Sequence, residues 1–181
     1  MKQNIMFIDP GTTFGWARTE EDWCRSGVVD LSKQTFGQRA VAFYKWLDDN
    51  CAGMNAVVFE ECFQKGPYAA QVYGGWLFGL ALYCETHNIP YLGVNVNTIR
   101  AYARRQGFFN DKVTAKKFQR QHNTSFPVPL DKKPRPRPEW KLSAPIRSQN
   151  NESDARWGLE YVLQEETVLN QLGIHTQPAI D

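Results

Sequence analysis

The sequence contains no apolar run close to the roughly 20 residues that a membrane-spanning helix requires. Its apolar stretch Ile5–Ile8 is also far too short for the central region of a signal peptide. We therefore expect no membrane partner and a cytoplasmic protein.

Cysteine is sparse, and no two of the four cysteines form a C-x-x-C pair: Cys24, Cys51, Cys62 and Cys84. This spacing argues against a structural zinc site and offers no disulfide framework, so we expect reduced, packed thiols. Aromatic residues make up 13% of the chain, which excludes a disordered protein. A length of 181 residues suits a substantial core, and we expect residues 1–181 to form a single domain.

Net charge is small, at +2, but it is unevenly distributed. Between Asp111 and Asn150, ten Lys and Arg residues stand against three acids, so the rest of the chain is acidic on balance. This asymmetry indicates a polyanionic partner, although a solvated basic loop would have the same composition. Most prolines fall in the same region, and we expect a basic, extended connection at about residues 123–150.

The pattern of apolar residues predicts strands and helices in alternation after an initial hairpin. The hairpin consists of strands at Ile5–Ile8 and Phe14–Arg18, joined by a turn at Pro10-Gly11. Further strands are predicted at Trp23–Leu31, Ala56–Phe59 and Pro90–Val96, and helices at Gln38–Cys51, Tyr68–His87, Thr98–Gln106, Lys112–Gln121 and Glu152–Glu165. This order predicts an α/β fold with a mixed five-stranded sheet that helices cover on both faces.

Two of the predicted strands end in acids. Asp9 closes the first strand in FIDPGTTFGWA, and Glu60 closes a later strand in VVFEECF. If these strands are parallel neighbours, their ends lie side by side, and Asp154 at the start of the last helix can reach the same edge. Crowded carboxylates either retain protons or bind a hard cation. Mg²⁺, with Mn²⁺ as a substitute, accepts oxygen ligands and works beside phosphate oxygens.

Two such ions about 4 Å apart would activate a water and stabilise the leaving oxygen of a phosphodiester. Each acid also has an ordinary explanation when it is taken alone. Asp9 precedes Pro-Gly, as turn residues do, and Glu60 could be a solvated strand end. Asp154 could be a first-turn acid that the helix dipole favours. The combination of the three acids, with a basic segment between the second and the third, favours a metal site.

The same segments resemble a known family. FIDPGTTFGWA is similar to the first motif of RuvC-type Holliday junction resolvases, VVFEECF to the second, and NNESDA to the closing motif. The motifs are short, and their order and spacing over nearly the whole chain carry the resemblance. It implies a ribonuclease H-like fold and an Mg²⁺-dependent endonuclease that resolves four-way (Holliday) junctions in DNA recombination and repair. The short chain and the variant closing motif indicate a phage-type member, so the resemblance implies the cytoplasm of a bacterium or of an infected host cell.

The resemblance implies roles for single residues. Asp9, Glu60 and Asp154 would be metal-binding and catalytic residues. Arg100, in NVNTIRAY, and Lys112, at a predicted helix start, would offset negative charge in the transition state. The resemblance also implies a homodimer formed through the region of the long apolar helix, because symmetric cleavage of two strands needs a two-fold axis.

The closing motif departs from the family pattern. The family has an acid or a His three or four residues before the last Asp, where this chain has Asn151 and Asn150. An amide oxygen can ligate Mg²⁺, so we assign Asn151 to the metal site, although it adds no charge. Asn150, or Glu152 if the helix starts late, could complete the site in its place, although Glu152 would lie on the wrong face of a regular helix. A helix N-cap is the alternative role for Asn151.

Aromatic and basic residues also fit a nucleic acid. Phe63, three residues after Glu60, could stack on a base at a junction, with ordinary core packing as the alternative. Four further residues are expected to contact phosphates and to make binding salt-dependent: Arg104, Arg105, Lys116 and Lys117.

Other functions fit parts of the same sequence. The DPGTT segment after Ile8 also resembles the phosphate-binding hairpin of sugar kinases and actin-like ATPases, but those proteins need two such lobes. A catalytically silent nucleic-acid-binding protein, or a relative that processes ribosomal RNA, stays open because of Asn150 and Asn151. Mg²⁺-dependent nicking of a four-way junction distinguishes these alternatives.

Overall fold

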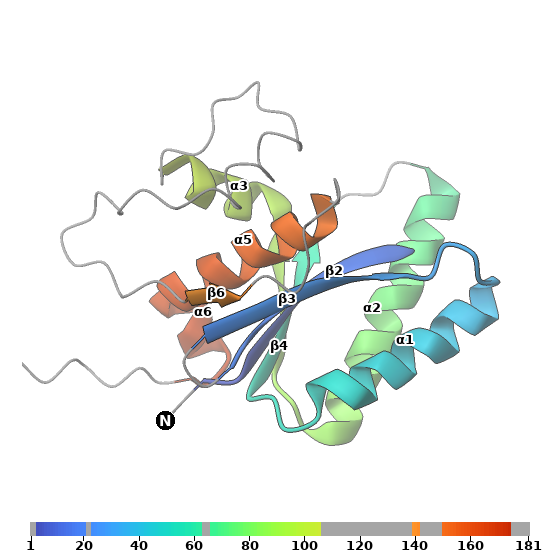
Figure 1. Ribbon diagram of the computed structural model, residues 1–181, viewed down its shortest axis with the longest axis horizontal. Coiled ribbons are helices and arrows are strands. Elements are labelled where there is room, and N and C mark those ends of the chain that lie inside the picture. Colours follow the sequence, from blue (N-terminus) through green and yellow to red (C-terminus); the bar gives the residue numbers. More distant parts are fainter. Residues whose placement is uncertain (1–2, 21–22, 63–65, 106–138, 142–149, 175–181) are drawn as a thin grey trace, which may run out of the picture.

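The computed structural model describes residues 3–20, 23–62, 66–105, 139–141 and 150–174. It is an α/β fold around one mixed sheet with the strand order β5-β4-β1-β2-β3-β6 (Figure 1). Strand β1 is antiparallel to β2 and parallel to β4, which is in turn parallel to β5. The strands are β1 (Ile5–Asp9), β2 (Thr13–Thr19), β3 (Trp23–Asp30), β4 (Ala56–Glu61), β5 (Tyr91–Asn95) and β6 (Glu139–Lys141).

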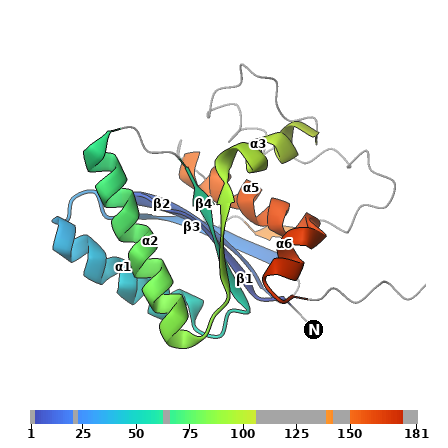
Figure 2. The same cartoon turned by 180° about the vertical axis from the view of Figure 1, so that it is seen from behind.

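Helices cover both faces of the sheet, as the sequence predicted. Helices α1 and α2 pack together on one face, and α3, α5 and α6 lie on the other (Figures 1 and 2). Their bounds are α1 (Phe36–Cys51), α2 (Pro67–His87), α3 (Val96–Arg105), α5 (Asn150–Gln164) and α6 (Glu166–Gln171). Among the described residues, no helix has the length and apolar character needed to cross a bilayer.

The alternation of side chains along the strands divides the core into two clusters. In β1, Phe7 belongs to the cluster under α3, α5 and α6, whereas Ile8 belongs to the cluster under α1 and α2. Successive side chains of a strand point to opposite faces, so Asp9 is directed to the same face as Phe7. In β4, Val58 lies in the α5-side cluster, and Glu60 follows it by two residues. The period of the strands therefore directs both acids toward the face that α5 covers.

All five predicted strands are present, and the sheet has a sixth. Strand β6 pairs in parallel with β3, inside the segment that we predicted to be an extended connection. The open edge of β3 offers unpaired backbone groups, and a short strand can satisfy them. The predicted helix at 112–121 lies outside the described residues.

The last predicted helix is also different in the structure. Helix α5 begins at Asn150, two residues earlier than predicted, and the short helix α6 follows it. The early start has a tertiary cause, because Glu152 in the first turn is buried and bonded to the sheet. Asp154 is therefore the fifth residue of α5 and does not open the helix.

Helix α2 is buried on one side only. Trp76, Leu80 and Tyr83 lie in the core cluster shared with α1, but Phe78 is 71% exposed and Leu82 is 49% exposed. A helix that is apolar most of the way round is normally buried on all sides, whereas α2 is buried only on the side that faces α1 and the sheet. The described residues leave its outer face as an apolar surface.

Candidate active site

Asp9 is the last residue of β1 and Glu60 the last but one of the parallel strand β4, and the strand register brings them together. Ile8 pairs with Phe59 between β1 and β4, so the next position along the two strands holds Asp9 and Glu60. Glu60 is buried and Asp9 is partly buried. The two carboxylates thus leave the sheet at one edge and on one face.

Asp154 approaches the same edge from α5. The first turn of α5 lies directly on β2, because a Cβ at Gly15 would overlap the backbone carbonyl of Asn151. Gly15 is the cross-strand partner of Asp9. The absence of a side chain at Gly15 therefore lets α5 pass beside Asp9 and bring Asp154 toward the two strand ends.

A buried polar network fixes the register of α5 on the sheet. The Ser26 hydroxyl, from β3, donates to Glu152 Oε1 at 2.6 Å. Arg156 donates from Nη2 to the same oxygen at 2.7 Å and from Nε to the Ser26 oxygen at 2.8 Å. All three side chains are buried, and removing one partner of such a network leaves an uncompensated charge. Glu152 is therefore bonded to Ser26 of β3 and to Arg156, and it does not join Asp9 and Glu60 at the strand ends.

The carboxyl groups of Asp9, Glu60 and Asp154, here called the acidic cluster, influence one another. Burial raises the pKa of Asp9 well above its usual range, and the charges of Glu60 and Asp154 raise it further. Burial and the charge of Asp154 raise the pKa of Glu60 to about 7. Burial raises the pKa of Asp154 to about 6. These groups therefore resist full ionisation near neutral pH unless a cation compensates them.

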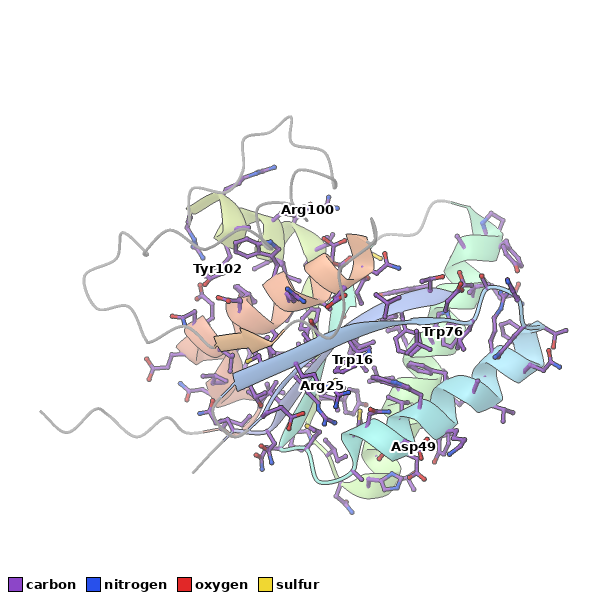
Figure 3. All side chains as sticks on the ribbon, in the orientation of Figure 1. Trp16, Arg25, Asp49, Trp76, Arg100 and Tyr102 are labelled. Atoms are coloured by element: carbon purple, nitrogen blue, oxygen red, sulfur yellow. The ribbon has the colours of Figure 1, made fainter. Side chains whose placement is uncertain are left out.

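Arg100 is the basic residue next to the acidic cluster. It lowers the pKa of Asp9, Glu60 and Asp154, which opposes the effects of burial and repulsion. Arg100 comes from α3, which follows β5 directly and packs against α5 (Figure 3). Its side chain is exposed, whereas Ile99 next to it is buried. A substrate phosphate at this edge would have a guanidinium within reach.

The acidic cluster suits Mg²⁺ by its chemistry but is not a closed cage. Within the described part of the chain, no three Asp, Glu, His or Cys side chains are arranged so that they could hold a metal ion. Mg²⁺ seldom uses such a cage, since it commonly takes one or two carboxylates and completes its shell with water and substrate phosphates. Burial and mutual repulsion disfavour the ionised forms of these carboxylates, and a bound divalent cation stabilises those forms. The donor set therefore fits the predicted ion.

Asn151 has a partner that the sequence did not predict. It is the second residue of α5, so it is not the N-cap, and its Nδ2 donates to the carbonyl of Thr13. This bond ties α5 to the start of β2 and leaves only the amide oxygen of Asn151 for a cation. The acid in the first turn of α5 is Glu152. The helix dipole acts within the first turn, so it does not account for an acid at the position of Asp154.

The remaining predicted site residues divide into two groups. Arg104 and Arg105 lie at the exposed end of α3, and Arg105 donates to Glu165 at 2.9 Å. Such an exposed ion pair is weak and does not prevent a phosphate contact. The other four predicted residues lie outside the described residues: Phe63, Lys112, Lys116 and Lys117.

Sequence analysis missed a tyrosine that contacts the end of β4. The Tyr73 hydroxyl, from α2, donates to the carbonyl of Glu60 at 2.6 Å and accepts from the N–H of Cys62 at 3.3 Å. Burial raises the pKa of Tyr73, so the hydroxyl keeps its proton. The available signal was Pro10, directly after Asp9, because a proline leaves a neighbouring strand without a backbone donor.

A hollow of about 280 Å³ opens between the turn after β1 and the N-terminal half of α2, on the face of the sheet opposite to the one toward which Asp9 and Glu60 are directed. Its lining residues are Pro10, Gly11, Thr12, Tyr68, Ala69, Val72, Tyr73 and Trp76. Three of these residues are aromatic, so the hollow offers flat apolar surface along the turn that follows Asp9.

No protein-family model and no curated protein matches this sequence. Two solved structures are similar over almost their full length. The structure titled T. thermophilus RuvC in complex with Holliday junction substrate has a TM-score of 0.57 and 15% identity, covering 96% of this chain and 98% of that chain. The Thermus thermophilus RuvC structure has a TM-score of 0.55 and 14% identity, covering 95% and 98%. At this identity the similarity shows the fold, and it confirms the expected RuvC-like form of the ribonuclease H-like fold.

Proposed function

We propose that this protein is a metal-dependent, structure-selective DNA endonuclease that cleaves four-way junctions. The observation that carries the proposal is the acidic cluster, in which two neighbouring strand ends and one helix contribute carboxylates to a single edge beside Arg100. The cluster occurs on a fold shared with RuvC, one structure of which is described as a complex with a Holliday junction substrate. DNA recombination and repair would be the setting for such an activity.

Each residue of the cluster has a role in this proposal. Asp9, Glu60 and Asp154 would hold Mg²⁺, or Mn²⁺ in its place. The bound ion would supply an activated water and stabilise the leaving oxygen of the phosphodiester. Arg100, already close to all three carboxylates, would orient the scissile phosphate and offset its negative charge.

DNA would cross the edge of the sheet at which β1 and β4 end. The hollow between the turn after β1 and α2 would offer aromatic surface to a base or a sugar, and its lining residue Tyr68 is 71% exposed. On the other side, Arg104 and Arg105 extend the basic surface that begins with Arg100. These contacts would follow the backbone of a branched DNA and make its binding salt-dependent.

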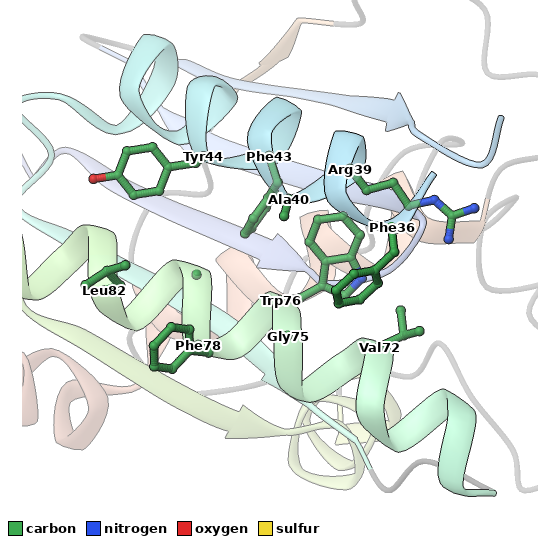
Figure 4. Close-up of a pocket in the computed structure, with 11 residues that line it drawn as sticks. Phe36, Arg39, Ala40, Phe43, Tyr44, Val72, Gly75, Trp76, Phe78 and Leu82 are labelled. Atoms are coloured by element: carbon green, nitrogen blue, oxygen red, sulfur yellow. The ribbon is translucent and has the colours of Figure 1, made fainter. Parts of the chain in front are cut away.

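A homodimer would provide the two cutting sites that one junction needs. An apolar groove of about 230 Å³ lies between α1 and α2 (Figure 4). Exposed aromatic and aliphatic side chains border it, among them Phe36, Tyr44, Phe78 and Leu82. Gly74 has open space around it and would let a second helix approach α2 closely. A second copy that covers this face by a two-fold axis would remove apolar surface from water.

The test is cleavage of a synthetic four-way junction with each strand labelled in turn, in Mg²⁺, in Mn²⁺ and in EDTA. We expect paired nicks in either metal with the unmodified protein and none with Asp9→Asn, which should still bind the junction. Glu60→Gln should be equally inactive. Glu61→Gln is the matched control, because Glu61 is its exposed neighbour on the opposite face of β4.

The alternative is a catalytically silent nucleic-acid-binding protein, and two observations favour it. The cluster is not a ready-made metal cage, and Asn151 donates to Thr13 instead of adding a charge. Tight junction binding without nicks in either metal would support this alternative. Absence of both binding and cleavage, or cleavage that Asp9→Asn leaves intact, would contradict the proposed function.

A further inference from the structure

The ladder between β1 and β4 can be followed residue by residue up to the acidic cluster. Ala56, whose partner in β1 is Ile5, donates its N–H to the carbonyl of Asn4, the residue before that partner. Backbone groups of a strand face its two neighbours alternately, so Glu60 and Cys62 also face β1. Their N–H and C=O groups need partners on that side.

The chain of β1 cannot supply the donor that the carbonyl of Glu60 needs. In a parallel ladder, a residue accepts at its carbonyl from the residue that follows its cross-strand partner. The position opposite Glu60 is Asp9, so the donor would be residue 10. Residue 10 is Pro10, which has no N–H. The ladder therefore stops at the point where Glu60 must be held beside Asp9.

The hydroxyl of Tyr73 occupies this break. It donates to the carbonyl of Glu60 at 2.6 Å and accepts from the N–H of Cys62 at 3.3 Å. One side chain from α2 thus supplies the donor that Pro10 cannot offer to the carbonyl of Glu60, and it also accepts from Cys62. Tyr73 and Pro10 both line the hollow between the turn after β1 and α2, so the helix, the turn and the strand end meet at this hydroxyl.

We propose that Tyr73 is a positioning residue: its hydroxyl replaces the strand partner that Pro10 removes and keeps the Glu60 carboxylate beside Asp9. The catalytic part of this inference rests on the proposed function, whereas the hydrogen-bonded contact itself does not. Without the hydroxyl, the last residues of β4 stay paired with β5, but the carbonyl of Glu60 loses its donor and the N–H of Cys62 loses this acceptor. Partners of this kind behind metal ligands typically change metal affinity or activity by about 10- to 100-fold.

Tyr73→Phe tests the proposal because it removes only the hydroxyl and keeps the ring. The matched control is Tyr91→Phe. The hydroxyl of Tyr91 donates to Glu85 at 3.0 Å, and Tyr91 pairs with Val57 at the opposite end of β4. Three quantities are compared in the full chain: amide hydrogen exchange at Cys62, the dissociation constant for a four-way junction, and the single-turnover cleavage rate at saturating protein over a Mg²⁺ series.

With Tyr73→Phe, the Cys62 amide should exchange at least about tenfold faster, because its acceptor is lost. Cleavage at limiting Mg²⁺ should fall about 10- to 100-fold, with junction affinity unchanged within about twofold. Tyr91→Phe should leave all three quantities as in the unmodified protein. A rate that recovers at high Mg²⁺ would further support a role in holding a metal ligand.

Three results for Tyr73→Phe would overturn the proposal. The first is unchanged amide exchange at Cys62, and the second is faster exchange with an unchanged cleavage rate across the Mg²⁺ series. The third is weaker junction binding with a normal cleavage rate at saturating protein, which would make Tyr73 a DNA contact. If the unmodified protein cleaves no junction, the proposed function fails, and exchange at Cys62 still decides whether Tyr73 holds the end of β4.

Discussion

The backbone carbonyl of Asn151 lies where a side chain at Gly15 would have to be. This contact joins α5 to β2 at the position that pairs with Asp9. It is supported on one side by the bond from Asn151 to Thr13 and on the other by the network of Ser26, Glu152 and Arg156. The location of Asp154 therefore depends on a glycine of FIDPGTTFGWA, the segment that also carries Asp9.

Gly15→Ala should displace the first turn of α5 and misplace Asp154. A methyl group forced into a tight contact typically lowers the free energy of unfolding by about 1–3 kcal/mol. Thermal unfolding should show this loss, and junction cleavage should fall more than junction binding. Gly37→Ala in α1 is the control, since no atom lies within 4 Å of a Cβ there. Equal stability of the two variants would contradict the close packing of α5 on β2.

The pKa values predict how stability depends on pH without metal. The pKa of Glu60 is about 7 in the folded protein and about 4.3 in an unfolded chain. Between these pH values the folded state binds more protons than the unfolded state, so the free energy of unfolding should fall as pH rises. We expect a loss of about 1–3 kcal/mol from pH 5 to pH 8 in EDTA, measured by chemical denaturation.

Glu60→Gln should reduce this pH dependence and leave the part that comes from Asp9 and Asp154, whose pKa values burial also raises. Mg²⁺ should stabilise the unmodified protein at pH 8 more than at pH 5. Glu61→Gln, at an exposed position on the other face of β4, should behave like the unmodified protein. A stability that rises between pH 5 and pH 8 would show that the carboxyl groups are not buried together.

The sequence predicted the strand ends correctly because a short-range pattern determines them. An apolar run that closes on Asp9 before Pro10, and a second that closes on Glu60, are readable without tertiary information. The start of α5 was not readable, since Asn150 and Asn151 resemble a cap. Their helical conformation depends on Ser26, more than a hundred residues away. The contact of Tyr73 with β4 is equally non-local, because only the register shows that Pro10 stands where the donor to the Glu60 carbonyl would be.

Asn151→Asp should change metal affinity and stability in opposite directions. The new carboxylate adds charge to the Mg²⁺ site, so the Mg²⁺ concentration for half-maximal cleavage should fall. The same change removes the donor to Thr13 and should lower the free energy of unfolding by about 1 kcal/mol. Asn170→Asp, at an exposed position of α6, is the control. An unchanged Mg²⁺ requirement would exclude Asn151 from the metal site.

Phe78→Asp should separate the proposed dimer. Phe78 borders the groove between α1 and α2 and is 71% exposed, so an isolated subunit should tolerate the charge that a dimer interface would not. Light scattering after size-exclusion chromatography should give a dimer for the unmodified protein and a monomer for the variant. Val41→Asp, which is equally exposed on α1 but does not border the groove, should remain dimeric. Identical masses for both variants would contradict this interface.

The basic, proline-rich segment gives the last prediction, which is based on its sequence alone. If its charges contact DNA phosphates, replacing them by Ala should weaken junction binding without changing the cleavage rate at saturating protein. The slope of log affinity against log salt should fall by up to about 0.9 for each lost duplex phosphate contact. The residues to replace together are Lys132, Lys133, Arg135 and Arg137.

A solvated linker predicts a different result from the same titration series. Its charges would act only through general screening, so the slopes of the unmodified protein and the quadruple variant would agree. Replacing Arg104 and Arg105 by Ala gives the internal reference, because these residues extend the basic surface of α3 beside Arg100. If that pair lowers the slope and the quadruple variant does not, the DNA-facing charges lie on α3 and the segment is a solvated connection.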